Sequence, residues 1–434
     1  MASIPEFASN LRASLEKLGN PKKEAEEMGK KALEIQFQRL IMTPLAAIAR
    51  EASEILTRVI VIDALDECKG DRIVGLICRL LSQLHGLGAV RLRVFLTSRS
   101  APHIVGAFKN IPHRSLSLLD FSDETKGDIS AFLEEGFAKI KADNNIMENP
   151  WPRPKDLDRL LALATNPSPL FIYAATLCRF VDDGTDNPTD QLEHWLDQAD
   201  SNASQLNGIY TPILNRLLFV YKAGEERQPI TSEARANLLK ILGAIALLVT
   251  PLSAPALAAL LDMNPGTVNF SLQRLHAVLD IPSDPTAPVE ILHKSFSDYL
   301  LRQEGTGISS FQVDRVATHA MLASKCIDRM NREDGLQYDM CKLRDPSKFR
   351  DDINKDIIHD RIPLDLEYAC VNWAFHMQHG GPGVPREDKA YKFLQKHFLH
   401  WLEGLSLLRE LPAGITSLRQ LIKVGLAPGL YLLC

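Results

Sequence analysis

The fold is decided by the stretch VIVIDALDEC, which covers residues 59–68. Its first four residues, Val59–Ile62, are all β-branched, and such a run predicts a strand buried on both faces, as in a parallel sheet. Asp63 comes directly after this strand. Because open parallel sheets bind ligands beyond the carboxyl ends of their strands, we expect the Asp63 carboxylate to face a binding crevice and to hold Mg²⁺ through water.

The residues that follow complete a strand–helix–strand unit. Leucine and isoleucine recur at intervals of three and four between Ile73 and Leu84, which predicts a helix with one apolar stripe. A second strand is expected at Leu92–Thr97, and a third, short strand at Ser115–Leu118. A helix between two strands of one sheet imposes parallel pairing, so the N-terminal part is predicted to be an α/β core.

Three charged residues near the strand ends are candidates for phosphate chemistry. Asp66 and Glu67 are placed to orient water or to act as a base in phosphoryl transfer, and acids after an apolar strand form the Walker B pattern. Arg99 follows the second strand, where its guanidinium can reach a terminal phosphate. The alternatives are a solvated acidic turn and an exposed arginine without a ligand.

Helices dominate the rest of the chain. Three prolines mark a linker at Asn144–Lys155. Further on, Ala254–Leu261 and Thr267–Leu279 predict two helices joined by a turn, and Val289–Leu292 adds a strand, an order typical of a winged helix. Arg274 is the one fixed positive charge of the second helix, and a helix that binds DNA needs several. DNA binding is therefore the least favoured function.

One apolar stretch, Ile241–Leu261, is uncharged and long enough to cross a bilayer. Pro251 and Pro255 interrupt it, and prolines inside a helix break the backbone hydrogen bonding. The stretch is therefore expected to form two soluble helices with a bend at Thr250–Pro255, and no membrane contact is predicted.

The composition is that of an ordinary globular protein. The 434 residues are 45% hydrophobic and 24% charged with a net charge of −5, which excludes a largely disordered chain and gives no sign of a strongly basic nucleic-acid binder. The seven cysteines include no C-x-x-C, and the N-terminus has no apolar region of a secretory signal. Reduced thiols and a cytoplasmic location are the expectation.

Two histidine pairs, His376/His379 and His397/His400, are spaced three apart on predicted helices. This spacing puts two imidazoles on one helix face, where they could share a zinc ion. No cysteine or acid completes a compact ligand set in the sequence, and each pair lies beside a tryptophan. Helix packing is therefore favoured over a metal site.

These motifs together resemble the NACHT domain of STAND-type P-loop NTPases, in the version common in fungal nucleotide-binding receptor proteins and also described as a nephrocystin-like N-terminal domain. The resemblance rests first on VIVIDALDEC and on LRVFLTSRSAPHI at residues 92–104. It extends over most of the chain to the segments SIPEFASNLRASL, FQRLIMTPL, LATNPSPLFIYAATLCRFV, ILHKSFSDYL, LEYACVNWAFHM and FLQKHFLHWLEGLSLL.

The resemblance implies a signalling protein that binds ATP or GTP with Mg²⁺. It further implies that Pro169 lines the adenine pocket and that His293 approaches the β-phosphate in the closed state. Each assignment has a structural alternative. Pro169 could start a helix as its first residue, and His293 could be satisfied locally at the end of a wing strand.

The sequence departs from the family at the Walker A loop, G-x-x-x-x-G-K-[ST], whose amides and lysine cradle the phosphates. The nearest string, Gly29-Lys30-Lys31, has Glu24 where the first glycine belongs. Without the strand that precedes this loop, Val59–Ile62 loses a pairing partner and exposes apolar surface. Either a partner covers this surface, or the chain is a degenerate or truncated copy in which Asp66 and Glu67 are vestigial.

The predicted architecture is α/β followed by mostly α. Residues 1–143 form a partial parallel-sheet NTPase core, 156–230 a helical domain, 231–305 a winged-helix-like domain and 306–434 a C-terminal helical region. The favoured function is a nucleotide-dependent switch in signal transduction or innate-immunity-like recognition, without NTP hydrolysis. The alternative is a non-catalytic scaffold for protein partners or self-association, and a winged-helix DNA-binding regulator comes third.

Overall fold

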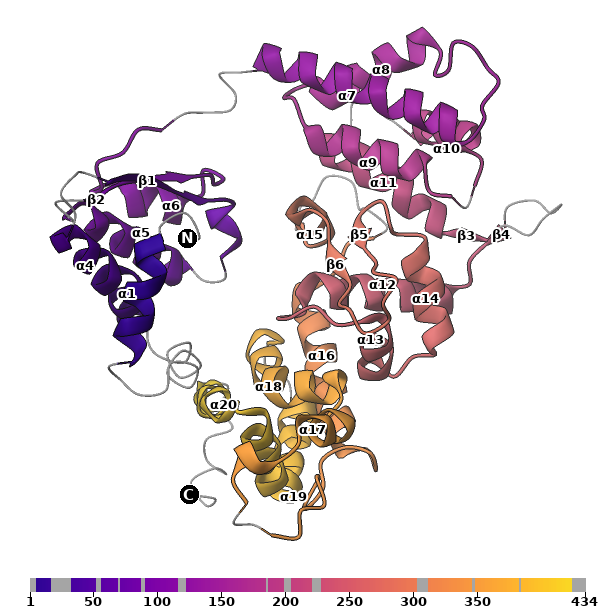
Figure 1. The fold of residues 1–434 in the computed structure, drawn as a ribbon. Helices are drawn as coiled ribbons and strands as arrows, with labels where there is room; N and C mark the ends of the chain where they lie inside the picture. Colours follow the sequence, from indigo (N-terminus) through magenta and orange to yellow (C-terminus); the bar gives the residue numbers. More distant parts are fainter. Residues whose placement is uncertain are drawn as a thin grey trace. The chain divides into compact units, whose positions relative to one another are not determined.

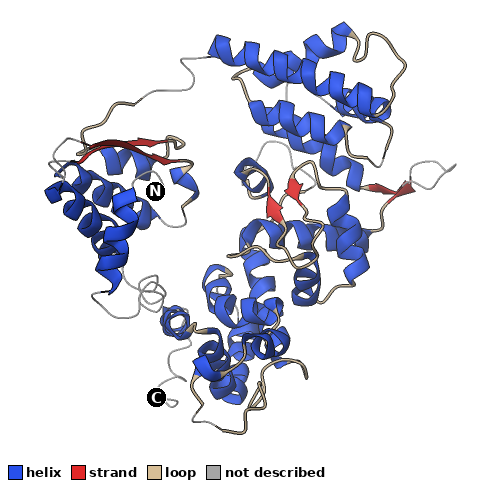
Figure 2. Ribbon diagram, in the orientation of Figure 1, coloured by secondary structure: helices blue, strands red, loops and turns tan. Residues whose placement is uncertain are grey.

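The computed structural model is mostly helical (Figures 1 and 2). The chain divides into two compact units, Met1–Ser117 (unit 1) and Leu118–Cys434 (unit 2), and each is described by itself. The structure describes residues 5–16, 33–51, 56–68, 71–86, 90–115, 122–184, 186–198, 204–220, 228–302, 311–345, 348–381 and 384–423.

Unit 1 is built around two parallel strands. Its elements are α1 (Pro5–Glu16), α3 (Leu33–Phe37), the π-helix η1 (Gln38–Met42), α4 (Thr43–Glu51), β1 (Leu56–Ile62), the 3₁₀ helix η2 (Leu65–Glu67), α5 (Asp71–Ser82), the 3₁₀ helix η3 (Gln83–Gly86), β2 (Val90–Leu96) and α6 (Pro102–Phe108). The strands pair in register from Leu56 opposite Val90 to Ile62 opposite Leu96. The predicted strand–helix–strand unit is confirmed, with α5 between the two strands.

Two sequence-based predictions for this part of the chain fall on undescribed residues. The expected third strand begins at Ser115, which is a loop residue, and its remaining residues 116–118 lie outside the described ranges. The string Gly29-Lys30-Lys31 also lies outside them.

The helices of unit 1 lie on one face of the sheet (Figure 2). Alternate strand residues point into that side: Ile60 and Val94 pack against a core formed with α1, α4 and α5, and Ile62 and Leu96 pack against a second cluster around Val74. The sheet therefore stabilises the unit through one face, because residues that alternate along a strand point to opposite sides.

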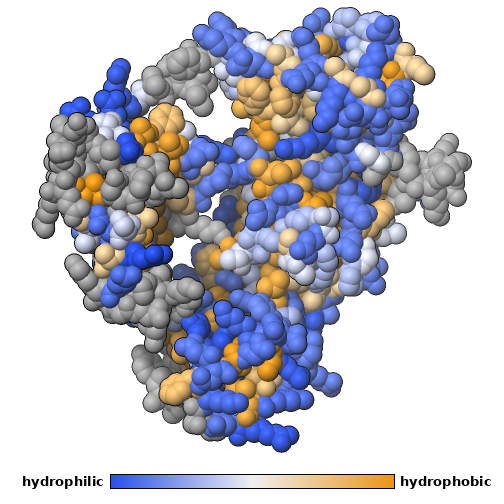
Figure 3. Space-filling view, in the orientation of Figure 1, coloured by the Kyte–Doolittle hydropathy of each residue, from blue (hydrophilic) through white to orange (hydrophobic). Residues whose placement is uncertain are grey.

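The other face of the sheet is exposed, so the prediction of a strand buried on both faces is wrong. Val59 and Val61 keep 61% and 66% of their surface exposed, and Phe95, which lies opposite Val61, keeps 56%. Apolar side chains come to the surface beside these strands in the space-filling view (Figure 3). We call these three residues the open sheet face. A missing neighbouring strand would open the edge of the sheet, so the exposure of this face does not test that expectation.

Unit 2 is helical, with two short antiparallel strand pairs in its described residues. Its elements are α7 (Ser122–Asp143), α8 (Pro154–Thr165), α9 (Phe171–Val181), α10 (Pro188–Gln198), α11 (Gln205–Leu217), β3 (Phe219–Val220), β4 (Gln228–Pro229), α12 (Ser232–Leu247), α13 (Ala254–Leu261), α14 (Pro265–Gln273), β5 (Leu279–Asp280), β6 (Glu290–Ile291), α15 (Lys294–Leu300), α16 (Arg315–Asn331), η5 (Arg350–Asp352), α17 (Lys355–Arg361), α18 (Leu364–His379), α19 (Val384–Leu408) and α20 (Leu411–Lys423). One continuous hydrophobic core joins these helices from Ile129 to Leu421.

The boundary between the units precedes α7, whereas the sequence placed residues 1–143 together and the linker at Asn144–Lys155. The reason is that α7 packs on α8 and α9. Its Leu133 and Phe137 are buried in the unit 2 core, and Phe137 meets Trp151 of the proline-rich stretch edge to face. The prolines therefore form part of a packed unit.

The apolar stretch Ile241–Leu261 forms the end of α12 and all of α13, with a break between Leu247 and Ala254, as its prolines predict. Leu257 of α13 and Leu272 of α14 are buried in the same core. No described helix of the chain is both long and apolar enough to span a membrane. The pair α13–α14 followed by the β5–β6 hairpin has the element order expected of a winged helix.

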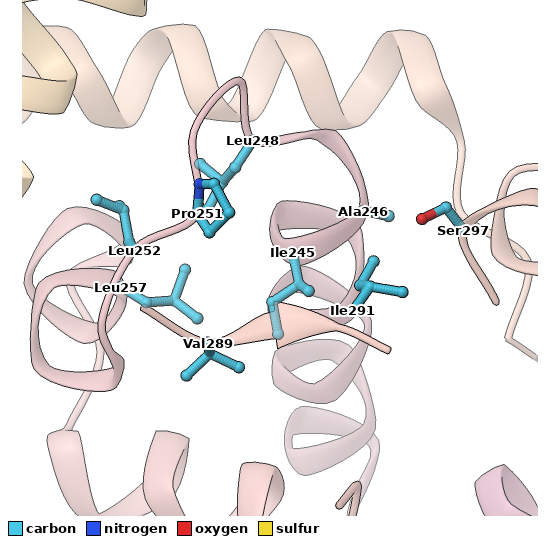
Figure 4. A pocket seen from close by; sticks show the side chains of 9 residues that line it. All are labelled: Ile245, Ala246, Leu248, Pro251, Leu252, Leu257, Val289, Ile291 and Ser297. Carbon is cyan, nitrogen blue, oxygen red and sulfur yellow. The ribbon is translucent and has the colours of Figure 1, made fainter. Parts of the chain in front are cut away.

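A cavity of about 190 Å³ opens within this segment, between α12, the loop before α13, β6 and α15 (Figure 4). The side chains that line it are apolar, Ile245, Leu257 and Ile291 among them, except for the Ser297 hydroxyl. A nucleotide needs a larger space and several converging polar groups. The cavity is therefore no candidate for the nucleotide site that the sequence suggests.

The one-sided sheet leads to a prediction for two matched substitutions. Val61→Thr changes an exposed side chain and should leave the stability of the sheet unchanged within about 0.5 kcal/mol. Val94→Thr puts the same hydroxyl against the core and should cost about 1 to 3 kcal/mol, because the hydroxyl loses water without gaining a partner. Hydrogen exchange of the β1 and β2 amides measures both effects. Equal loss of protection in the two variants would contradict the exposed face.

Candidate functional site

The carboxyl ends of β1 and β2 lie side by side and carry most of the residues that the sequence singled out. Asp63 follows β1, and Thr97 and Arg99 follow β2. Because Ile62 pairs with Leu96, Asp63 and Thr97 come next to each other across the sheet. The Thr97 hydroxyl donates a hydrogen bond to Asp63 Oδ1, so the carboxylate is held in place at the sheet edge.

Thr97 also ties the backbone after β1 to the end of β2. Its N–H donates to the Ile62 carbonyl at 3.0 Å, its carbonyl accepts from the Leu65 N–H at 3.0 Å, and its Oγ1 accepts from the Ala64 N–H at 2.9 Å. Ala64 has a left-handed backbone with φ of 51°, which is costly for a residue other than glycine. The hydrogen bonds to Thr97 hold this turn in shape.

Asp66 holds the turn that carries Arg99. Its Oδ1 accepts from the Arg99 N–H at 3.1 Å and from the Ser98 hydroxyl at 3.5 Å, and its Oδ2 lies 3.5 Å from Arg99 Nε. The Asp66 side chain is 9% exposed, whereas that of Arg99 is 48% exposed. Arg99 thus pairs with Asp66, and Glu67 beside it is exposed.

This edge of the sheet carries the two kinds of group that bind the phosphates and the magnesium ion of a nucleotide. The fixed, exposed Asp63 carboxylate suits a metal-bound water, and the half-exposed Arg99 guanidinium suits a phosphate oxygen. A phosphate at Arg99 would compete with the Asp66 carboxylate for the same charge. Asp66 itself is engaged in the turn, so its geometry fits the role of an anchor better than that of a base.

Thr97 is the residue of this edge that sequence analysis missed, although a signal was present. A parallel register that continues one step past Ile62 and Leu96 sets Thr97 against Asp63. A hydroxyl next to a strand-end carboxylate is a natural hydrogen-bond partner.

Pro169 belongs to unit 2, in the turn between α8 and α9. The first residue of α9 is Phe171 and its N-cap is Leu170, so the alternative that Pro169 starts the helix as its first residue is wrong. The turn is held from α11 instead, because Gln205 Nε2 donates to the Ser168 carbonyl at 2.8 Å and to the Leu163 carbonyl at 3.4 Å.

His293 is the N-cap of α15, directly after the β6 strand region. Its Nδ1 accepts from the Ser295 N–H at 3.2 Å and lies 2.5 Å from Ser295 Oγ. Ser295 Oγ lies 2.6 Å from the hydroxyl of Tyr210 on α11. His293 is therefore hydrogen-bonded locally, as the alternative to phosphate binding predicts. Through Ser295 it is also connected to Tyr210 on α11.

The first histidine pair lies against a neighbouring helix, and the two rings of the second pair contact each other within α19. His376 lies fully buried between α16 and α18, where its Nδ1 is 2.8 Å from His319 Nδ1 and its Nε2 is 2.7 Å from the Tyr368 hydroxyl. His397 Nδ1 lies 3.1 Å from His400 Nδ1. Among the residues that the structure describes, no group of three or more histidine, cysteine or acidic side chains could hold a metal ion.

Burial keeps the His319–His376 pair neutral. Desolvation, with smaller contributions from His319 and His379, lowers the pKa of His376 to about 3. Desolvation, followed by the charges of His379 and Arg315, lowers the pKa of His319 to about 4. The Tyr368 hydroxyl accepts from the Val249 N–H at 3.0 Å and is then free to donate to His376, so the pair links α16 and α18 to the loop after α12.

Comparisons with known proteins found similarity in sequence to one family and to one curated protein. Residues 3–99 match the family described as nephrocystin 3, N-terminal, and this range contains both strands and their acidic and arginine turns. The vegetative incompatibility protein HET-E-1 of Podospora anserina is 22% identical over 389 residues, which cover 83% of this chain and 26% of that protein. Residues 3–99 thus resemble a nephrocystin 3 N-terminal domain, and most of the chain is similar to part of HET-E-1.

A solved structure was also found: the crystal structure of a signal transduction ATPase with numerous domains (STAND) from Pyrococcus horikoshii, which has a tetratricopeptide repeat sensor. It matches with a TM-score of 0.34 and 13% identity, over 96% of this chain and 56% of that one. The chain therefore spans about a quarter of the length of the curated relative and about half of the solved one.

The Thr97 contacts predict a local effect of Thr97→Val. The variant keeps the shape of the side chain but removes the hydroxyl that serves both Asp63 and the Ala64 N–H, so opening of the turn at 63–67 should become about 1 to 3 kcal/mol easier. Ser98→Ala is the matched control, because its hydroxyl makes a long bond to Asp66 on the exposed side. Amide exchange at 63–67 that is the same in both variants would contradict this role.

The buried histidines predict that unit 2 loses stability in acid. The unfolded chain protonates these imidazoles from their ordinary pKa of 6.5 downward, but the folded chain does so only near pH 4 and 3. Between these values the unfolded state holds more protons, so the free energy of unfolding falls as the pH falls. Urea unfolding at several pH values should show a shallower fall for His319→Asn, with the exposed His359→Asn as control. An unchanged slope would refute the assignment.

Proposed function

We propose that this chain is part of a NACHT/STAND-type signalling protein in which a bound nucleotide controls the arrangement of the helical segments. The observation that carries the proposal is the edge of the β1–β2 sheet, where Asp63 and the Asp66–Arg99 pair meet at the ends of adjacent parallel strands. ATP or GTP with Mg²⁺ fits this edge in kind. The nucleotide supplies the phosphates whose number distinguishes two states of such a switch.

In this proposal each residue has a separate task. In unit 1, Asp63 holds a water of the magnesium ion and Arg99 contacts the terminal phosphate. For unit 2 we propose separately that Pro169 contacts adenine and that His293 contacts a phosphate. Asp66 keeps the Arg99 turn in place and Glu67 remains without a catalytic task.

We further propose that the switch works by binding and not by turnover. Phosphoryl transfer depends almost wholly on positioning the β- and γ-phosphates and on stabilising their charge. The printed sequence contains no Walker A string for that task. The engagement of both Asp66 oxygens by the Ser98–Arg99 turn also argues against a free carboxylate base.

The relation to a vegetative incompatibility protein supports a role in recognition and signalling of an innate-immunity-like kind. Free thiols at the six cysteines that the structure describes suit the cytoplasmic location that we propose.

A second candidate function is a non-catalytic scaffold, and the open sheet face favours it. Val59, Val61 and Phe95 form neighbouring apolar surface on two paired strands, and exposed apolar surface of this kind marks contact sites. The partners would be other proteins or a second copy of the chain. Direct DNA binding finds less support, because the Arg274 guanidinium donates to the Arg216 and Phe219 carbonyls at 2.6 and 3.1 Å.

Nucleotide binding by the purified chain separates the two functions. With a fluorescent methylanthraniloyl derivative of ADP or ATP, we expect saturable, magnesium-dependent binding that Arg99→Ala weakens about 10-fold, the loss of one charge-assisted contact. Arg79→Ala on α5 is the matched control, because it removes an exposed arginine of the same unit. Phosphate release should stay at background throughout.

Two outcomes would contradict the switch. Absence of binding would favour the scaffold, and steady-state turnover that Asp63→Asn abolishes would show a catalytic enzyme.

A further inference from the structure

Helix α11 contacts both segments of unit 2 that carry predicted nucleotide-binding residues. At its start, Gln205 Nε2 donates to the Ser168 carbonyl in the turn of Pro169 at 2.8 Å. One to two turns further along, the Tyr210 hydroxyl lies 2.6 Å from Ser295 Oγ, which in turn lies 2.5 Å from His293 Nδ1. The sequence singled out neither Gln205 nor Tyr210 as a candidate site residue.

The direction of these hydrogen bonds follows from the backbone N–H of Ser295, which can only donate. The backbone N–H of Ser295 donates to His293 Nδ1, so this nitrogen carries a lone pair and no proton. Ser295 Oγ at 2.5 Å from the same lone pair must then donate its own proton to it. The remaining lone pairs of Ser295 Oγ accept the proton of Tyr210, so the relay runs from Tyr210 through Ser295 to His293.

This direction fixes the imidazole. A neutral ring whose Nδ1 accepts carries its proton on Nε2, and the two donors at Nδ1 also fix the ring's orientation. Ser295 is 6% exposed and Tyr210 is 1% exposed, so water competes little for these bonds. Burial of both hydroxyls makes loss of either bond costly.

We infer that Tyr210, through Ser295, is a positioning residue that sets the tautomer and orientation of His293, and that α11 couples His293 to the Pro169 turn. A shift of α11 against α15 would break the relay and release the ring. The effect on nucleotide binding rests on the proposed function, whereas the effect on the ring does not.

The chain offers a matched control on the same two helices. Thr211 follows Tyr210 on α11, and its Oγ1 lies 3.2 Å from the hydroxyl of Tyr299 on α15. Thr211→Val removes a hydrogen bond between α11 and α15 without touching the relay. Tyr210→Phe and Ser295→Ala interrupt the relay from opposite ends, so either one tests it if the other fails to fold.

The test is ¹⁵N NMR of the full chain with labelled histidine, where His293→Asn identifies the signal. In the wild type we expect widely separated Nδ1 and Nε2 signals from one fixed tautomer. In Tyr210→Phe and Ser295→Ala the two signals should move toward each other, because Ser295 Oγ is then released from donating to Nδ1 or is absent, and the longer backbone bond of 3.2 Å is left to favour the wild-type tautomer. Thr211→Val should keep the wild-type separation. Wild-type separation in both relay variants, or an equal change in Thr211→Val, would overturn the inference.

Binding of methylanthraniloyl-ADP to the same variants then tests the proposed function separately. If His293 contacts phosphate, Tyr210→Phe should weaken binding about 5-fold to 10-fold, the value of one lost hydrogen bond, and Thr211→Val should not. A wild-type chain that binds no nucleotide would contradict the proposed function, while the NMR result would still decide the relay.

Discussion

The parallel pairing of β1 with β2 is the constraint on which the candidate site depends. Only this pairing brings the Asp63 turn and the Arg99 turn to one edge, because parallel strands end on the same side of a sheet. Thr97 then fixes the positions of the two strand ends, because it forms hydrogen bonds with Asp63, Ala64 and Leu65. Without these bonds the left-handed Ala64 would have little to hold it.

At the same edge, Asp66 both positions the charged Arg99 side chain and leaves part of it exposed for another anion. Asp66 is nearly buried and accepts from the turn of Arg99, so it stabilises the position of the arginine and partly neutralises it. The Arg99 side chain is half exposed, where an ion pair contributes little to stability and can be exchanged for another anion. An arginine of this kind is suited to reporting a phosphate, which is the role that we propose.

Unit 2 is organised differently, through a buried core and a few polar links that cross it. The Tyr210–Ser295–His293 relay joins α11 to α15, and the Tyr368–His376–His319 chain joins the loop after α12 to α16 and α18. Such buried polar links specify one arrangement of the helices, because each group would lose its partner in any other. Movement between two arrangements would have to exchange these bonds together.

The sequence by itself determined the local features of this protein. The run Val59–Ile62, the apolar stripe of α5 and the second strand were enough to predict the strand–helix–strand unit, because periodicity and β-branching act over a few residues. The prolines of Ile241–Leu261 were likewise enough to predict two helices.

Tertiary structure decided which face of the sheet is covered, since four β-branched residues in a row have the same pattern whether one face or both are buried. It also decided the partners of the site residues. Asp63 with Thr97, Asp66 with Arg99 and His293 with Tyr210 are pairs that lie far apart in the chain. Their contact depends on how strands and helices pack, a long-range property that no local pattern encodes.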